Sequence, residues 1–238
     1  MSESKENWRL EYINVSKDQT LNFDVKSPEN FIDEIKLKYL RQYLPESGTI
    51  VEIGAGSGRF LTRIGLENKN LSLIGIDFES AKMVRDNILK FDLNGISVQA
   101  DAYHLPIKSN SVDVVISGGF LEHFNEEELN KILKESRRVL KPNGLFYAEI
   151  VPRKFSSCRP IIFTQMGGYE NSFSKKKWKE ILKDNEYKNI KIVSGLVLPP
   201  NFYCWFKSGM LLEKTYKLKY LIEYMDNSII SEIFGFSY

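Results

Sequence analysis

The chain has 238 residues, of which 42% are hydrophobic and 27% are charged, and its formal net charge at pH 7 is +2. This length and composition suit one globular α/β domain with an extension. The small net charge argues against a nucleic-acid partner, for which a strongly basic face is expected. Cys158 and Cys204 form no C-x-x-C pair, which argues against a zinc site or a disulfide framework.

The sequence offers no segment that would direct the chain into or across a membrane. The first residues, 1–6, are polar, and nowhere is there an uninterrupted apolar run of the roughly 18–20 residues that span a bilayer. We therefore expect a cytoplasmic protein.

Helical and extended patterns alternate along most of the chain. Residues 1–28 are mixed in composition and predict an arm or lid with little regular structure. Beyond them, apolar spacing and turn residues predict helices at 29–44, about 59–66, 79–93, 125–140 and 174–187. The predicted strands are residues 50–53, 71–78, 96–102, 112–117, 145–151 and 189–198, and a turn at 141–144 precedes the fifth of them.

Strands that alternate with helices this regularly predict βαβ units and an α/β fold with a doubly wound, mainly parallel, seven-stranded sheet. We divide the single domain (1–238) into the arm at 1–28, a core at 29–198, an insertion at 199–232 and the start of a last strand at 233–238. The insertion combines an aromatic cluster at 202–206 with an amphipathic helical pattern at 211–229. Packing of this helical insertion on the core or on a second subunit is its simpler interpretation, and a peripheral membrane contact is the alternative.

A glycine-rich turn follows the first predicted strand. Gly54, Gly56 and Gly58 occupy alternate positions between that strand and a helix, where backbone N–H groups can approach a nucleotide-like ligand. Acids stand within or after the first three strands, at Glu52, Asp77 and Asp101. Because ligands of doubly wound sheets bind beyond the carboxyl ends of the strands, we expect these residues to surround one crevice, together with 117–123 and 149–152.

The spacing of these residues limits the choice of ligand. Asp77 lies about 20 residues past the glycines, where an acid can accept hydrogen bonds from both hydroxyls of a ribose. The spacing G-x-G-x-G differs from the G-x-G-x-x-G of dinucleotide-binding folds, which disfavours an NAD-dependent oxidoreductase. No G-x-x-x-x-G-K-[ST] is present, so the sequence contains no P-loop.

Five segments, in this order, resemble the motifs of the class I S-adenosylmethionine-dependent methyltransferases, and more narrowly the branch called methyltransferase type 11. They are residues 51–58 (Val-Glu-Ile-Gly-Ala-Gly-Ser-Gly), 75–78 (Gly-Ile-Asp-Phe), 100–106 (Ala-Asp-Ala-Tyr-His-Leu-Pro), 112–123 and 139–145 (Val-Leu-Lys-Pro-Asn-Gly-Leu). The resemblance covers roughly residues 45–152. It implies a Rossmann-like fold, S-adenosylmethionine as cofactor, S-adenosylhomocysteine as its product, and no metal.

The resemblance also implies roles for single residues. Asp77 would bind the ribose, Phe78 would pack on the adenine, and Asp101 would accept a hydrogen bond from the adenine amino group. Apart from these roles, His123 is the first candidate for a general base or an acceptor contact. The full set of implied cofactor residues is Glu52, Gly54, Gly56, Gly58, Asp77, Phe78, Asp101, Ala102, Ser117 and Gly118, and Glu122 and Glu149 are the further candidates for a base.

Each assignment has a plainer alternative. The glycines could merely permit a tight turn, Asp77 could cap a helix, and Asp101 could be a solvated loop acid. For His123 a structural role weighs as much as a catalytic one, and His104 is more simply a loop residue. The lysines at 175–177 suit the solvated face of a helix.

The methyl acceptor is not specified by these motifs. The arm, residues 153–173 and the insertion are aromatic-rich, with Arg153, Lys154 and Arg159 near the expected mouth of the crevice. We expect a small-molecule acceptor that is sugar-, lipid- or quinone-like, and a monomer or a homodimer. Two other function classes stay open: an NAD-dependent oxidoreductase and a non-catalytic S-adenosylmethionine-binding or scaffold protein.

Overall fold

The computed structural model describes residues 21, 23, 28–150, 169–194 and 232–237. Several expectations fall outside these residues: most of the arm, the insertion at 199–231, Cys158, Cys204, Arg153, Lys154 and Arg159.

The described elements alternate as the sequence predicts. The helices are α2 (Pro28–Leu40), α3 (Arg59–Glu67), α4 (Ala81–Lys90), α5 (Glu126–Val139) and α7 (Lys175–Asp184), with 3₁₀ turns η1 (Arg41–Tyr43) and η2 (Leu121–His123). The strands are β1 (Gly48–Ile53), β2 (Leu71–Asp77), β3 (Gly95–Gln99), β4 (Val112–Gly118), β5 (Leu140–Ile150), β6 (Ile190–Ser194) and β7 (Glu232–Ser237).

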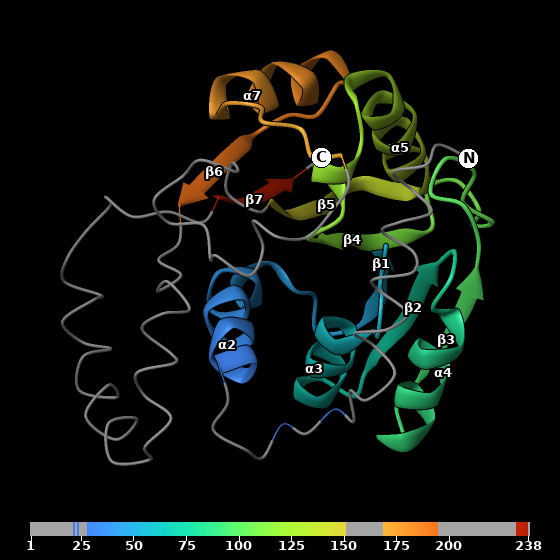
Figure 1. Cartoon of the computed structure of the whole chain (residues 1–238). Coiled ribbons are helices and arrows are strands. Elements are labelled where there is room, and N and C mark those ends of the chain that lie inside the picture. The colour runs from blue at the N-terminus through green and yellow to red at the C-terminus, as the bar shows by residue number, and fades with distance from the viewer. Residues whose placement is uncertain (1–20, 22, 24–27, 151–168, 195–231, 238) are drawn as a thin grey trace, which may run out of the picture.

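The strands form one sheet in the order β3-β2-β1-β4-β5-β7-β6 (Figure 1). Neighbours among β1 to β5 pair in parallel, and β7 runs antiparallel to both β5 and β6. The chain moves outward from β1 to β3 and then returns to place β4 on the other side of β1. The parallel, doubly wound core is therefore confirmed, and its strand order reverses between β1 and β4, where sheets of this kind bind ligands.

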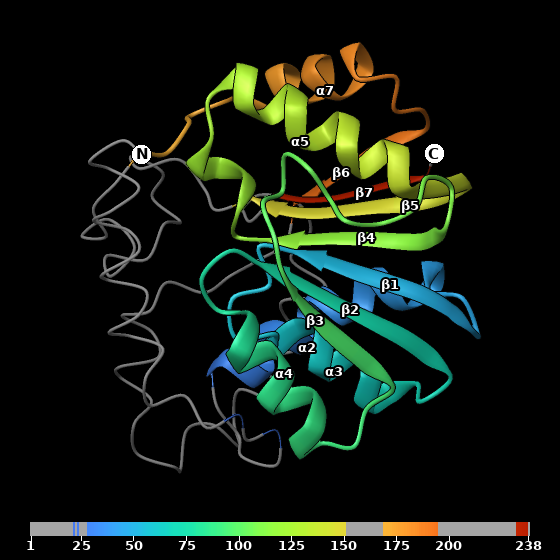
Figure 2. The ribbon, with the colours of Figure 1, turned by 90° about the vertical axis from the view of Figure 1, so that its right-hand side faces the viewer.

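Helices cover both faces of this sheet, as Figure 2 shows: α2, α3 and α4 lie on one side, α5 and α7 on the other. Alternate residues of a strand point to opposite faces, and the two buried clusters follow that rule. Ile50 and Ile116 pack with Leu37 of α2 and Leu61 of α3. Val51, Ile53 and Val115 belong to the second cluster, with α5 and α7. Central strands covered on both faces account for the nearly continuous apolar runs in the sequence.

The third strand ends earlier than predicted. β3 stops at Gln99, which pairs with Asp77 at the end of β2, rather than at Ala102. The Asp101 carboxylate accepts a hydrogen bond from the Tyr103 N–H at 2.9 Å, and such a local bond favours a turn over continued pairing. Asp101 therefore lies in the loop after β3.

The fifth strand begins earlier than predicted, because the expected turn at 141–144 is a bulge within it. Val112 pairs with Leu140 and Val114 with Leu145, so four residues of β5 lie opposite Asp113 alone. Asn143 has a φ of 64°, and both carboxylate oxygens of Asp113 lie 2.9 Å from the Lys141 Nζ. The turn chemistry was correctly recognised, but the strand continues on both sides of it.

No helix in the described ranges combines the length and the apolar character that crossing a membrane requires.

Candidate cofactor site at the carboxyl ends of the strands

The glycine turn between β1 and α3 requires glycine. Gly54, Gly56 and Gly58 have φ values of 63°, 56° and 69°, a region that side chains disfavour. The turn is closed by a hydrogen bond from the Gly58 N–H to the Ala55 carbonyl oxygen at 2.7 Å and is tied to β2 by the Ala55 N–H, which donates to Ile76 at 3.0 Å. The backbone is thus fixed by its own bonds.

Asp77 joins this turn to the start of α4. One carboxylate oxygen accepts from the Gly56 N–H at 2.8 Å, and the other accepts from the N–H groups of Glu79 at 2.9 Å and Ser80 at 2.7 Å. Asp77 therefore has a structural role as well, because its carboxylate accepts hydrogen bonds from the backbone of the glycine turn and of the residues before α4. A carboxylate offers about four acceptor positions, so one remains after these three bonds.

Phe78 and Asp101 lie on neighbouring loops. The side chain of Phe78 is 55% exposed, which is unusual for a phenylalanine directly after a buried strand. Gln99 at the end of β3 donates its side-chain N–H to the Phe78 carbonyl oxygen at 2.8 Å and so links the two loops. Asp101 is exposed and Ala102 is buried. An exposed ring beside an exposed carboxylate can contact a planar ligand and its polar edge.

Glu52 is buried at 4% exposure beneath the glycine turn. Its Oε2 accepts a hydrogen bond from the Leu61 N–H at 3.2 Å, in the first turn of α3. Burial raises the pKa of Glu52 to about 8, against the opposing effects of this bond and of the positive charge on Lys36. The carboxyl group thus fastens β1 to α3.

A partly buried ion pair beside Glu52 was not recognised in the sequence. Lys36 of α2 places its Nζ 2.6 Å from Oε2 of Glu149, whose side chain is 12% exposed. One turn earlier, Asp33 is 3% exposed and accepts from Arg59 Nε at 2.8 Å. The sequence did contain an indication of this buried cluster, because the spacing of Asp33, Leu37 and Leu40 places the acid on the buried face of α2. Tyr43, near the end of the helix predicted at 29–44, is 41% exposed.

The end of β4 provides Ser117 and Gly118. Ser117 is fully buried, and its Oγ has no hydrogen-bond partner within the described part of the chain. A Cβ atom placed on Gly118 would lie 3.7 Å from Glu149 Oε2 and 4.0 Å from Glu52 Oε1. Gly118 therefore leaves a notch between two carboxylates, which we call the Gly118 notch.

An aromatic side chain that sequence reasoning missed packs on the glycine turn. A Cβ atom on Gly54 would lie 2.4 Å from the ring of Phe120, so the ring rests directly against the Gly54 backbone. The Phe120 ring centroid is 4.7 Å from that of Phe124, which in turn lies 6.0 Å from that of Tyr103. This aromatic row connects the loops after β3 and β4.

The two residues proposed as acid–base groups lie in η2, next to this aromatic row. Glu122 is 1% exposed, and the Asn171 N–H donates to its carbonyl oxygen at 2.7 Å. His123 is partly buried, with Nδ1 3.3 Å from the carbonyl oxygen of Tyr169. This contact supports a structural role for His123. Its role as a general base stays a hypothesis.

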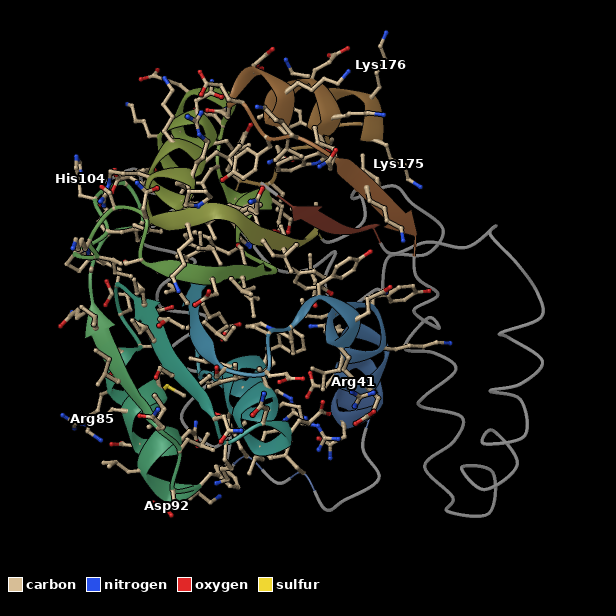
Figure 3. All side chains as sticks on the ribbon, turned by 180° about the vertical axis from the view of Figure 1, so that it is seen from behind. Arg41, Arg85, Asp92, His104, Lys175 and Lys176 are labelled. Atoms are coloured by element: carbon tan, nitrogen blue, oxygen red, sulfur yellow. The ribbon has the colours of Figure 1, made fainter. Side chains whose placement is uncertain are left out.

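Other polar residues singled out in the sequence lie away from the site. His104 is exposed at the edge of the molecule (Figure 3). Lys175 and Lys176 of α7 point away from the fold, and Lys177 pairs with Glu126 of α5 at 2.7 Å. Among the described residues, no group of three or more His, Cys, Asp or Glu side chains is arranged to hold a metal ion.

A glycine turn after β1, with acids after β2 and β3 at the reversal of a doubly wound sheet, defines the class I S-adenosylmethionine-dependent methyltransferase architecture. Residues 51–148, from β1 to β5, match the family described as "Methyltransferase domain". The region from β1 to β5 is therefore a methyltransferase domain of this class, in the type 11 branch.

The curated relatives match over this core. Phosphoethanolamine N-methyltransferase 1 of Triticum aestivum is 33% identical over 100 residues, which are 40% of this chain and 20% of that protein. Malonyl-[acyl-carrier protein] O-methyltransferase of Geobacter sulfurreducens is 29% identical over 103 residues, 42% of this chain and 38% of that one. The chain thus spans between a fifth and two fifths of the length of these relatives.

The solved structures agree in fold. The 1,6-didemethyltoxoflavin-N1-methyltransferase of Burkholderia thailandensis, solved with S-adenosylhomocysteine, has a TM-score of 0.64 at 13% identity and covers 100% of this chain and 91% of that one. The [4+2]-cyclase SpnF has a TM-score of 0.66 at 14% identity, over 98% and 93% of the two chains. Identities this low establish the fold alone, and SpnF is named for a different reaction.

Proposed function

We propose that this chain binds S-adenosylmethionine across the glycine turn and transfers its methyl group to a small-molecule acceptor by direct in-line displacement. The observation that carries the proposal is the joined set of Gly56, Asp77 and Phe78: a left-handed turn bonded to an acid that is followed by an exposed ring. The residues present fit the cofactor, since Asp77 keeps an acceptor position and Gly118 places no side chain between Glu52 and Glu149.

The donor side of the site follows from this placement. The cofactor, when bound, would supply an electrophilic methyl group on a sulfonium. Asp77 would accept from the ribose, Phe78 would pack on the adenine, and Asp101 would accept from the adenine amino group beside the Ala102 backbone. Glu52 would hold the glycine turn in place through α3.

The acceptor side is proposed at Ser117, Gly118 and η2. These residues follow β4, where an acceptor must align with the methyl group while water is excluded. His123 is the first candidate for a general base, followed by Glu122 and Glu149, and a base is needed only for a hydroxyl or an acidic carbon acceptor. A sugar-, lipid- or quinone-like acceptor and a cytoplasmic location remain part of the proposal.

A second candidate function is a protein of this fold that binds the cofactor or another ligand without transferring a methyl group. The similarity to the [4+2]-cyclase SpnF favours keeping it, because that protein shares the fold. Incubation with S-adenosylmethionine and a broad acceptor panel, followed by mass spectrometry, separates the two. Cofactor binding without any methylated product would favour the second candidate, and turnover slowed by His123→Ala with unchanged binding would support the first.

Calorimetry of the purified chain with S-adenosylmethionine, S-adenosylhomocysteine and NAD tests the cofactor directly. We expect both sulfur compounds to bind and NAD not to bind. Phe78→Ala should weaken binding about twofold to twelvefold, because stacking of an aromatic pair contributes about 0.5–1.5 kcal/mol. Since Phe78 is 55% exposed, the melting temperature should change little.

The matched control is Leu89→Ala on α4, which removes a 70% exposed apolar side chain away from the turn and should leave the affinity unchanged. Failure of the wild-type chain to bind either sulfur compound would overturn the proposed function. Equal affinity of Phe78→Ala and wild type would remove Phe78 from the site.

A further inference from the structure

Two carboxylates from different strands meet under the proposed donor site. Glu52 of β1 and Glu149 of β5 lie on either side of β4, and both approach the Gly118 notch, at 4.0 Å and 3.7 Å from a Cβ built there. All three positions lie on the face of the sheet covered by α2 and α3, at its carboxyl edge. The notch is therefore an acidic recess next to the glycine turn.

The charges around this recess do not balance when every group is ionised. The cluster contains three carboxylates, on Asp33, Glu52 and Glu149, and two cations, on Lys36 and Arg59. The Lys36 Nζ lies 2.6 Å from Glu149, and Arg59 Nε lies 2.8 Å from Asp33. Among the residues that the structure describes, Glu52 is the carboxylate of the cluster without a direct cationic contact, so these five groups carry one excess negative charge.

The remaining titratable groups that face the cluster leave this excess in place. The Tyr147 hydroxyl lies 3.3 Å from Glu149 Oε1 and stays neutral, because burial raises its pKa well above the usual value. Arg63 of α3 acts on Asp33 but is paired with Glu34 of α2. Tyr39 of α2 acts on Tyr147 rather than on the carboxylates.

A buried excess charge is unfavourable, and a bound proton or a cationic ligand can remove it. Burial raises the pKa of Glu149 as well, but Lys36 contacts Glu149 directly and acts on Glu52 only at longer range. Burial lowers the pKa of Lys36, yet the attraction of Glu149, Asp33 and Glu52 outweighs it, so Lys36 stays charged. Glu52 is therefore the member that keeps a proton at neutral pH.

We propose that the Lys36–Glu52–Glu149 cluster distinguishes the methyl donor from the demethylated product by charge, holding one proton when free and releasing it when the donor binds. The inference rests on the proposed function. The donor has a net charge of +1, from sulfonium, ammonium and carboxylate, whereas the product thioether has a net charge of zero. The proton leaves the Glu52 carboxyl group for solvent, and no covalent bond forms or breaks elsewhere.

Glu52 and Lys36 act in this scheme as specificity-determining residues rather than catalytic ones. A fixed positive charge near the recess stabilises the ionised Glu52, so donor binding and proton release favour each other. The neutral product brings no positive charge to stabilise the ionised form, so the Glu52 carboxyl group keeps its proton. Donor affinity should therefore rise with pH, and product affinity should not.

Calorimetry in two buffers of different ionisation enthalpy counts the protons released on binding. At pH 6–7, below the ordinary range of an α-amino group, neither ligand changes its own charge. We expect close to one proton released per S-adenosylmethionine and close to none per S-adenosylhomocysteine. The donor Kd should fall about tenfold from pH 6 to pH 7, while the product Kd stays nearly constant.

Glu52→Gln supplies the variant test, because the amide is neutral and keeps an oxygen for the Leu61 N–H. It should abolish proton release and flatten the pH dependence of donor binding. Glu127→Gln on α5, an 81% exposed carboxylate, should behave as wild type. Equal proton counts for the two ligands in the wild-type chain would overturn this inference alone, whatever the variant does. Absence of binding by both ligands would overturn the proposed function with it.

Discussion

At the scale of the residue, Glu52 best illustrates what a sequence can and cannot give. An acid inside an apolar strand needs a partner, which is visible from the sequence. The identity of that partner is not, because the Leu61 N–H, Lys36 and Glu149 reach it from α3, α2 and β5. The same applies to Gly54, whose contact with the Phe120 ring depends on how the loop after β4 returns to the turn.

The raised pKa of Glu52 predicts how stability depends on pH. The carboxyl group titrates near 4.5 in the unfolded chain and near 8 in the fold. Between these values the folded state holds a proton that the unfolded state lacks, so the free energy of unfolding falls as pH rises. The slope from this group approaches about 1.4 kcal/mol per pH unit and vanishes above pH 8. Burial raises the pKa of Asp33 too, which adds a slope of the same sign.

Urea unfolding of wild type and Glu52→Gln at pH 6, 7 and 8 measures this effect. The variant should lose most of the slope and should be the more stable protein at pH 8, since it buries no charge. Parallel pH profiles for the two proteins would show that Glu52 is not the group responsible.

At the scale of the element, α5 forms where its local sequence predicts. The Asn125 side chain accepts from the Glu128 N–H at 3.0 Å, and the Glu128 carboxylate accepts from the Asn125 N–H at 3.1 Å. This reciprocal pair is a capping box. Leu129, Ile132 and Leu133 then bury the apolar stripe of the helix. A cap depends on residues three apart, so its signal is complete in the sequence.

Asn125→Ala should lower the free energy of unfolding by about 1 kcal/mol, because an N-terminal N–H loses its acceptor. Thermal unfolding followed by circular dichroism measures it. Glu127→Ala, in the same turn but outside the box, is the control and should cost less than half as much. Equal effects of the two substitutions would show that the box contributes no special stability.

The bulge in β5 shows a limit of local sequence signals. The residues at 141–144 contain a correct turn signal, and Asn143 adopts the left-handed conformation expected of such a residue. Whether the chain leaves the sheet there depends on Asp113 of β4, which holds both Lys141 and the Thr49 N–H. Asp113 and its two partners belong to three different strands, so the sequence of β5 alone does not predict the bulge.

At the scale of the whole molecule, Lys36 attaches α2 to the far side of the sheet reversal. It reaches Glu149 of β5, and its Nζ also lies 5.3 Å from the Phe60 ring centroid of α3. Lys36→Met removes the cation and leaves Glu149 with a buried charge, which should cost about 2 kcal/mol, less than for a fully buried pair because the Lys36 side chain is 24% exposed.

The double variant Lys36→Met/Glu149→Gln should recover part of that loss, since no charge is then left without a partner. Urea unfolding of the two single variants and the double variant at pH 7 gives the coupling free energy. Effects that simply add would mean that the ion pair does not join α2 to the sheet.

Local features of the sequence were sufficient to predict the fold class of this protein. The alternation of apolar runs, the left-handed glycines and the acids after β2 and β3 are local features, and each specifies its own backbone geometry or its place at a strand end. Five of them in order were enough to name the methyltransferase architecture and to predict which residues would bind its cofactor.

Only the tertiary structure decided which charges share one buried recess. Asp33 and Lys36 of α2, Glu52 of β1 and Glu149 of β5 come from three separate parts of the chain. They meet because β4 inserts between β1 and β5 while α2 covers that face. Electrostatic energies depend on distance and burial in space, so the excess charge beside the Gly118 notch could be counted only after the fold was known.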